Sequence, residues 1–152
     1  KREMNKDRLR EEIAADEGCR MEIYLDHLGL PTMGIGHLLT QDDPEYNYAV
    51  GTVITEERVR QLFALDIAVT IEDCRIIYPD FEDLPEEAQL VIANMCFQLG
   101  RPRLSKFRKM KAAIDERRWN DAADEMVDSR WHDQTPNRAK RLVKRIRDLA
   151  DG

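Results

Sequence analysis

Apolar and polar residues change their spacing twice near the start of the chain. Residues 6–16 carry apolar side chains four positions apart with charges on the opposite face, which predicts a helix that Gly18 ends. Residues 21–26 then alternate between apolar and polar side chains, which is the period of a β-strand. Residues 30–39 contain two glycines and predict another short strand, so we expect a small sheet of two or three strands.

The remainder of the chain has the spacing of helices. Thr55 is a suitable N-cap for a long helix that ends before Pro79. The apolar stripe of this helix consists of Val59, Leu62, Phe63, Ile67 and Ile71. Residues 85–99 are apolar on nearly every side, which predicts a central buried helix. Three further helices are expected at about 104–116, 119–130 and 137–149.

This order of elements predicts an α+β protein, mainly helical, that forms one domain over residues 1–152. We expect a small antiparallel-sheet lobe at residues 16–54, of which the part from residue 41 is a connector. A linking helix follows at residues 55–78. Residues 1–15 and 79–152 make up a helical lobe, and clefts between such lobes are where polymer substrates bind.

The composition is that of a soluble, globular protein. The chain has 152 residues, of which 42% are hydrophobic and 36% charged, enough for one core. No apolar run reaches the length of a membrane span, and the first ten residues contain no secretory signal. We therefore expect a monomer that is made in the cytoplasm and has no membrane span.

The three cysteines predict free thiols. Cys19, Cys74 and Cys96 lie far apart and form no CxxC spacing, so a reducing compartment is expected. Cys19 and Cys96 have apolar neighbours, which predicts that both are buried. The three histidines share no ligand spacing, so we expect no zinc site and no other metal or cofactor.

Charge is divided unevenly along the chain. The net charge is −6, but residues 1–100 carry −12 and residues 101–152 carry +6. A solvated surface of uneven composition explains this distribution, and so does steering of an anionic ligand toward the basic part. A nucleic-acid partner is disfavoured, because the chain as a whole is acidic and contains no groove-reading motif.

Two acidic residues occupy unexpected positions. Glu17 precedes the glycine that ends the first helix, and Asp26 ends the first strand, so the two could face each other from different lobes. Glycoside hydrolysis requires two carboxyl groups across a gap, one that donates a proton and one that stays charged. The chain contains 30 acidic residues, however, so spacing alone favours surface charges over catalysis.

The wider segment resembles the T-even type of phage lysozyme, glycoside hydrolase family 24. The family pattern E-G-x-R…Y-x-D…G-x-x-T-x-G-I-G-H stands here, without a gap, as Glu17, Gly18, Arg20, Tyr24, Asp26, Gly29, Thr32, Gly34, Ile35, Gly36 and His37. Residues 94–100, NMCFQLG, and residues 129–141, SRWHDQTPNRAKR, resemble further family blocks in the same order. The resemblance spans nearly the whole chain. It implies a lysozyme-like fold that hydrolyses the β-1,4 bonds from N-acetylmuramic acid to N-acetylglucosamine in bacterial peptidoglycan.

The resemblance also implies roles for individual residues. Glu17 would be the general acid, Asp26 its charged partner and Thr32 the neighbour of the attacking water, in a reaction that inverts the anomeric centre. An inverting enzyme needs its two carboxyl groups roughly 6.5–9.5 Å apart. Arg138 resembles an arginine that orients the acid from the helical lobe, whereas its spacing alone indicates a helix-face arginine. Gln134 would lie close to Arg138.

Further matches concern the binding of sugar and the hinge. Leu38 and Phe97 match family positions that line the sugar-binding cleft, although each is also a plausible core residue. Gln98 with Trp131 resembles a buried polar contact of the family at the hinge.

His37 and Asp66 are expected to form a structural ion pair. His37 has apolar neighbours, which is typical of a core histidine with a hydrogen-bond partner. Asp66 lies beside the apolar stripe of the long helix and therefore needs a partner. The family resemblance pairs the two residues.

The sequence also departs from the family. The connector between Thr40 and Thr55 is about ten residues shorter than the T-even pattern, in the segment that would form the outer wall of the cleft. Two family sugar contacts fall on Met110 and Glu125, which lack the usual small or amide side chains. Because the chain is acidic, we expect only weak, salt-sensitive attraction to the anionic wall, mainly through residues 138–147.

The sequence is compatible with a main functional hypothesis and two alternatives. The main hypothesis is a muramidase that acts on the cell wall after release from the host cytoplasm and lyses the host. The second is a catalytically weak or inactive peptidoglycan-binding module of a phage particle, suggested by the short connector and the two lost contacts. A lytic transglycosylase is disfavoured, because it needs one acid and this chain carries both Asp26 and Thr32.

Overall fold

The computed structural model, which describes residues 3–152, has its first helix, α1, at Lys6–Glu17. The two apolar residues that the sequence places on one face, Leu9 and Ile13, are fully buried. Gly18 follows the helix with a φ of +73°, a left-handed conformation that suits glycine and ends the helix. The first predicted helix and its stop signal are therefore confirmed.

The predicted sheet has three antiparallel strands in the order β1-β2-β3. Its strands are β1 (Arg20–Leu25), β2 (Pro31–Gly34) and β3 (His37–Leu38). The connector adds a segment that the sequence did not indicate, because residues 51–54 bond to the other edge of β1. Ile23 N donates to Thr52 O (2.9 Å) and Ile54 N donates to Met21 O (2.8 Å).

The long helix α2 spans Glu56–Ile77 and begins as predicted. The Thr55 hydroxyl oxygen accepts a hydrogen bond from Arg58 N (3.2 Å), which is an N-cap. All five residues of the predicted stripe are buried. The sheet and the first part of α2 share a core made of Ile23, Met33, Leu39, Ile54, Val59 and Leu62.

The described chain divides into two compact units. One unit is Arg10–Val69, which contains the sheet. The other comprises Thr70–Gly152 and the described residues up to Leu9. Helices α1 and α2 each contribute residues to both units.

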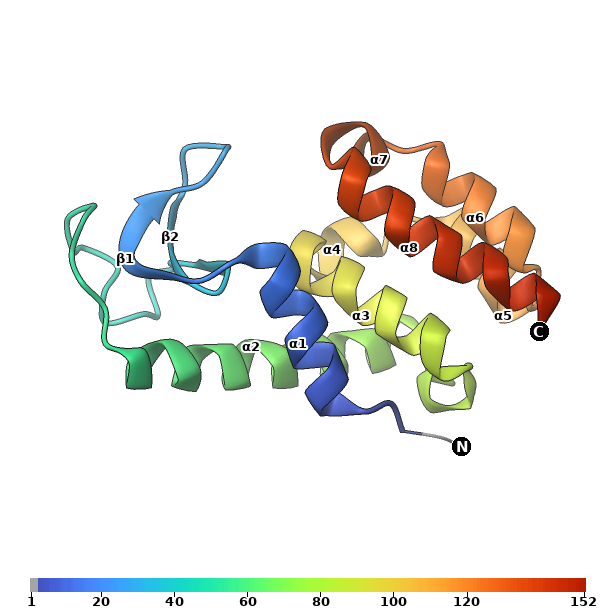
Figure 1. The fold of residues 1–152 in the computed structure, drawn as a ribbon, viewed down its shortest axis with the longest axis horizontal. Coiled ribbons are helices and arrows are strands. Elements are labelled where there is room, and N and C mark those ends of the chain that lie inside the picture. Colours follow the sequence, from blue (N-terminus) through green and yellow to red (C-terminus); the bar gives the residue numbers. More distant parts are fainter. Residues whose placement is uncertain (1–2) are drawn as a thin grey trace. The chain divides into compact units, whose positions relative to one another are not determined.

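The second unit is helical and is built around α3 (Glu86–Leu99), on which every residue from Ala88 to Cys96 is buried. This confirms the predicted central helix. The unit also contains η1 (Phe81–Asp83), α4 (Arg101–Leu104), α5 (Arg108–Asp115), α6 (Trp119–Val127), α7 (Arg130–Gln134), α8 (Pro136–Asp148) and η2 (Leu149–Asp151). Figure 1 shows α8 packed beside α3, α6 and α7.

Two predicted helices are interrupted in the structure. The segment expected at 104–116 is divided by a turn, and α5 begins only at Arg108. The helix expected at 119–130 ends at Val127, because Ser129 starts a new helix by accepting a hydrogen bond from His132 N (3.1 Å).

The fold class is confirmed, since a mainly helical chain carries a small antiparallel sheet. The prediction for Cys19 is wrong: this thiol is exposed, because it lies in the turn between α1 and β1, whereas Cys74 and Cys96 are buried. Within residues 3–152, no helix combines the length and the apolar character needed to span a bilayer.

Candidate active site

Glu17 is the last residue of α1 and its half-buried carboxyl group packs against the turn between β2 and β3. A Cβ atom added to Gly36 in this turn would lie 2.5 Å from Glu17 Oε1. Gly36 also has a φ of +64°, which side chains rarely adopt. The glycine therefore provides the space in which the Glu17 carboxyl group lies.

Asp26 and Thr32 are held by the same residue of the turn between β1 and β2. Asp26 Oδ1 accepts hydrogen bonds from Leu28 N (2.8 Å) and Leu30 N (2.9 Å). The Thr32 hydroxyl donates to Leu30 O (2.9 Å). Because both side chains bond to the backbone of Leu30, their relative positions are fixed by a rigid turn. Thr32 is 4% exposed, and its hydroxyl oxygen retains a lone pair that can accept a hydrogen bond from water.

Tyr24 shows that both acids contribute to one electrostatic environment. Burial raises the pKa of Tyr24, the charges of Glu17 and Asp26 raise it further, and Arg20 opposes them. The Arg20 guanidinium carbon lies 4.4 Å from the centre of the Tyr24 ring, a cation–π contact. In the sheet, Tyr24 pairs with Thr32. The sequence pattern contained Tyr24 but gave it no role.

The three proposed catalytic residues belong to one unit. Glu17, Asp26 and Thr32 all lie in Arg10–Val69, whereas the sequence led us to expect Glu17 and Asp26 on different lobes. The reason is local, because only Gly18 and Cys19 separate α1 from β1. The relative position of the two acids is therefore set within this unit.

His37 lies between two carboxylates. Its Nδ1 is 2.7 Å from Asp66 Oδ2 on α2, so the structure brings the expected pair together. Its Nε2 is 2.9 Å from Asp43 Oδ2 in the connector, which the sequence analysis missed. Burial opposes the charge on His37, but the hydrogen bonds that its ring donates to Asp66 and Asp43 outweigh burial and raise the pKa of His37 to about 9.

Asp43 is held in place by more than His37. Its carboxylate also accepts a hydrogen bond from Thr40 N (2.9 Å). Burial raises the pKa of Asp43, but the bonds from Thr40 and His37 together lower it below its ordinary value. The position of Asp43 six residues after His37, in the acidic start of the connector, is the only sequence signal that could have indicated it.

A second ion pair attaches the connector to α2. Arg58 Nε lies 2.6 Å from Glu45 Oε2 and Arg58 Nη2 lies 3.1 Å from Glu45 Oε1, a two-pronged contact. Glu45 is buried, at 7% exposure. The short connector is thus held by Asp43 at one point and by Glu45 at another.

In the helical unit, one expected polar contact is present, and Arg138 forms a contact that was not predicted. Trp131 Nε1 donates to Gln98 Oε1 (2.8 Å), which joins α3 to α7. Arg138 Nε donates to Asn94 Oδ1 (2.9 Å), which satisfies the buried amide of Asn94. The contact of Arg138 with Glu17 that the resemblance implies stays a prediction.

The remaining predicted residues differ in exposure. Leu38 on β3 is 46% exposed, so its core interpretation is wrong, and it is available to a ligand. Phe97 on α3 is half-buried, which leaves both of its interpretations in place. Gln134 ends α7 with an exposed side chain and lines a pocket of the helical unit.

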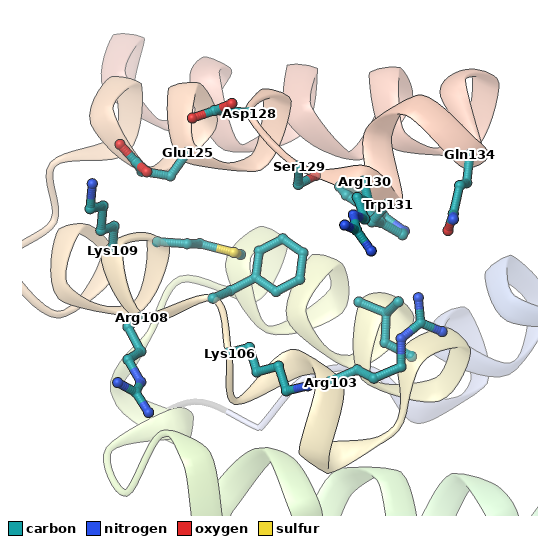
Figure 2. A pocket seen from close by; sticks show the side chains of 13 residues that line it. Arg103, Lys106, Arg108, Lys109, Glu125, Asp128, Ser129, Arg130, Trp131 and Gln134 are labelled. Atoms are coloured by element: carbon teal, nitrogen blue, oxygen red, sulfur yellow. The ribbon is translucent and has the colours of Figure 1, made fainter.

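This pocket has a volume of about 640 Å³ and lies wholly within the helical unit (Figure 2). Met110, Phe107 and Trp131 contribute apolar surface, and the rings of Phe107 and Trp131 meet edge to face at 6.3 Å. Met110 and Glu125, the two altered family positions, both line it. The loss of small polar side chains at these positions therefore changes the lining of an actual pocket.

Five cations surround the pocket, namely Arg103, Lys106, Arg108, Lys109 and Arg130. We call them the pocket cations. Figure 2 shows Arg103 and Lys106 on one side of the opening and Arg130 on the other. Among residues 3–152, none of the five forms a side-chain hydrogen bond or ion pair, and all are exposed.

The cations of α8 are mostly engaged. Lys144 pairs with Asp148 (2.8 Å), Arg145 with Glu87 (3.1 Å) and Arg147 with Asp124 (2.8 Å). Their positive charge is locally neutralised, so the basic helix that the sequence suggested for wall contact offers less free charge than its composition indicates.

In the described part of the chain, no group of three or more His, Cys, Asp or Glu side chains is arranged to hold a metal ion.

Comparison with known proteins gives four relevant matches. A family profile described as "Phage lysozyme" matches residues 14–148. "Probable T4-type lysozyme 2" of Dictyostelium discoideum is 31% identical over 155 residues, which cover 89% of this chain and 91% of that protein. "Peptidoglycan hydrolase gp36" of Pseudomonas phage phiKMV is 31% identical over 90% of this chain and 15% of its own length. The "Pre-baseplate central spike protein Gp5" of Enterobacteria phage T4 is 26% identical over 89% of this chain and 27% of its own length.

Proposed function

The chain belongs to the phage lysozyme family and is a peptidoglycan hydrolase, and on that premise we propose that it is an inverting muramidase. It cleaves the β-1,4 bond from N-acetylmuramic acid to N-acetylglucosamine, and its biological role is lysis of the bacterial host after release from the cytoplasm. The observation that supports the mechanism best is the position of Glu17, Asp26 and Thr32 in one unit, two of them bonded to the same turn.

In this mechanism Glu17 donates its proton to the glycosidic oxygen while the bond from that oxygen to the anomeric carbon breaks. Asp26 stays charged and stabilises the oxocarbenium-like centre. A water molecule next to Asp26 and Thr32 attacks the opposite face of the sugar and passes its proton to the carboxylate. The product is a reducing end of inverted configuration. Afterwards Asp26 releases this proton to solvent and Glu17 takes one up, which restores both groups for the next cycle.

The turn that holds Asp26 suits its role. Two backbone N–H groups orient Oδ1, so the carboxylate keeps one geometry as charge develops on the sugar. Thr32 donates to Leu30, which leaves its oxygen to accept from the attacking water. Leu38, which is exposed on the same hairpin, provides apolar surface for a sugar ring.

For attraction to the anionic wall, the pocket cations replace α8 as the proposed contact. Unpaired cationic side chains attract anionic groups more strongly than cationic side chains that already form an ion pair with a carboxylate. The partner in this proposal remains peptidoglycan, and the protein acts as a monomer without a nucleic-acid partner.

The decisive test compares wild type with Glu17→Gln on purified murein sacculi. Gln has the shape of Glu but no proton to donate, so release of reducing ends should fall by about 10²–10⁴-fold. Glu22→Gln is the matched control: it makes the same change on β1 at an exposed position and should keep full activity.

The chemical form of the products separates the alternatives. Mass spectrometry of the muropeptides should show hydrolysed ends, and NMR should show the inverted anomer first. Anhydro ends would indicate a transglycosylase. Binding to sacculi without new ends from wild type would reject the hydrolase and favour the binding module of a phage particle.

A further inference from the structure

The hairpin of β2 and β3 carries Thr32, the proposed neighbour of the attacking water, and it contacts Glu17, the proposed proton donor. Thr32 lies on β2 and pairs with Leu38, while Met33 pairs with His37. The turn of the same hairpin brings Gly36 against the carboxyl group of Glu17. Any movement of this hairpin therefore changes the distance between the proton donor and the residue next to the attacking water.

Two contacts attach the hairpin to neighbouring elements. At one end of the turn, Gly34 is so close to α2 that an added Cβ would lie 3.2 Å from Val59 Cγ1. At the other end, His37 reaches Asp66 on α2 through Nδ1 and Asp43 in the connector through Nε2. The contact of Gly34 with Val59 is apolar and has no preferred direction, whereas the hydrogen bonds of His37 fix the orientation of its ring.

The chemistry of the imidazole ring makes the double contact specific. A neutral imidazole carries one N–H group and can donate to only one of the two carboxylates. Both bonds form only with the doubly protonated imidazolium. Arg58 is a further charge that acts on Asp43: it lies on α2 and is itself bonded to Glu45. The charged ring therefore links β3, α2 and the connector, and the His37 side chain is only 14% exposed.

We propose that His37, held by Asp43 and Asp66, is a positioning residue that sets the hairpin so that Glu17 and Thr32 keep their working distance. This proposal rests on the proposed function, because the catalytic roles of Glu17 and Thr32 come from it. Asp43 belongs to the connector, and Asp66 belongs to α2. The connector therefore contributes to the active site through His37, without contacting the substrate.

The test uses Asp43→Asn, with Glu45→Gln as a matched control. Both changes remove one carboxylate from the connector, but Asp43 bonds His37 of the hairpin whereas Glu45 bonds Arg58 of α2. Kinetics on sacculi should show that Asp43→Asn lowers kcat by about tenfold with KM changed less than twofold, because misplaced groups lose rate rather than binding. Glu45→Gln should keep kcat while its melting temperature falls.

Two further measurements make the result decisive. Asp43→Glu, which restores the charge, should recover part of the kcat. The backbone amide signals of Glu17 and Gly36 in ¹H–¹⁵N NMR spectra need no catalysis, and their chemical shifts should change in Asp43→Asn but not in Glu45→Gln. Equal losses of kcat in the Asn and Gln variants, or unchanged amide signals, would overturn the proposal. If wild type released no reducing ends, the proposed function would fail, and the amide signals would still test the positioning.

Discussion

Gly36 combines two constraints at one position. Its φ of +64° is unfavourable for residues with a side chain, and the space beside its Cα is occupied by the Glu17 carboxyl group. Gly51 has only the first constraint, since its φ is +94° and nothing lies within 4 Å of an added Cβ. The two glycines therefore separate backbone strain from displacement of the proposed acid.

We predict that Gly36→Ala lowers activity on sacculi by about 10²-fold, because the new methyl group pushes Glu17 out of place. Gly51→Ala should keep its activity. Each variant should lose about 1 kcal/mol of unfolding free energy from backbone strain, measured by urea denaturation. Full activity of Gly36→Ala at a temperature where it is folded would contradict the role of Gly36 in placing the carboxyl group.

At the scale of elements, His37 joins β3, α2 and the connector by charge. A histidine whose folded pKa is raised stabilises the protein fully below its unfolded pKa, and this stabilisation is lost as the pH rises through the folded value. For His37 the loss occurs between pH 6.5 and about 9. Asp43, whose pKa is lowered, loses its contribution as the pH falls below 3.8.

We predict that the stability difference between wild type and His37→Gln is on the order of 2–3 kcal/mol at pH 6 and shrinks toward pH 9.5. Chemical denaturation at several pH values measures it. The effect of Glu45→Gln should stay constant over this range, because neither Glu45 nor Arg58 changes its charge there. A difference for His37→Gln that did not vary with pH would show that His37 stabilises the fold by packing alone.

At the scale of the whole molecule, net charge describes this protein poorly. The chain carries −6, yet its pocket cations lack partners among residues 3–152 while several cations of α8 are paired. Interaction with an anionic polymer depends on where unpaired charge lies, and salt screens it over about 8–10 Å at ordinary ionic strength.

We predict that Arg103→Gln/Lys106→Gln weakens binding to sacculi roughly fivefold at low salt, which corresponds to about 1 kcal/mol. Lys144→Gln/Arg147→Gln removes the same formal charge from paired positions and should weaken binding less than twofold. Co-sedimentation at increasing salt measures both effects, and the difference should disappear near 1 M. Equal losses in the two double variants would restore α8 as the wall contact.

Much of the fold could be predicted because its signals are local. The period of the apolar residues defined α1, β1 and α2, and Thr55 and Gly18 marked the ends. The interrupted helices were missed because the cap of Ser129 competes with a continuous apolar pattern. The pairing of residues 51–54 with β1 was missed because a partner strand leaves no mark in a short connector.

The sequence by itself determined the order of elements, the buried faces and the contiguous pattern that names Glu17, Asp26 and Thr32 as candidates, since all of these depend on neighbouring residues. Only the tertiary structure decided that Gly36 lies against the Glu17 carboxyl group, that Asp43 as well as Asp66 bonds His37, and that Cys19 is exposed. The first two features depend on contacts between side chains of different elements, and the third on the path of the chain at the turn that holds Cys19. A charged or small residue looks the same in the sequence whether its neighbour in space is water, a carboxylate or a backbone.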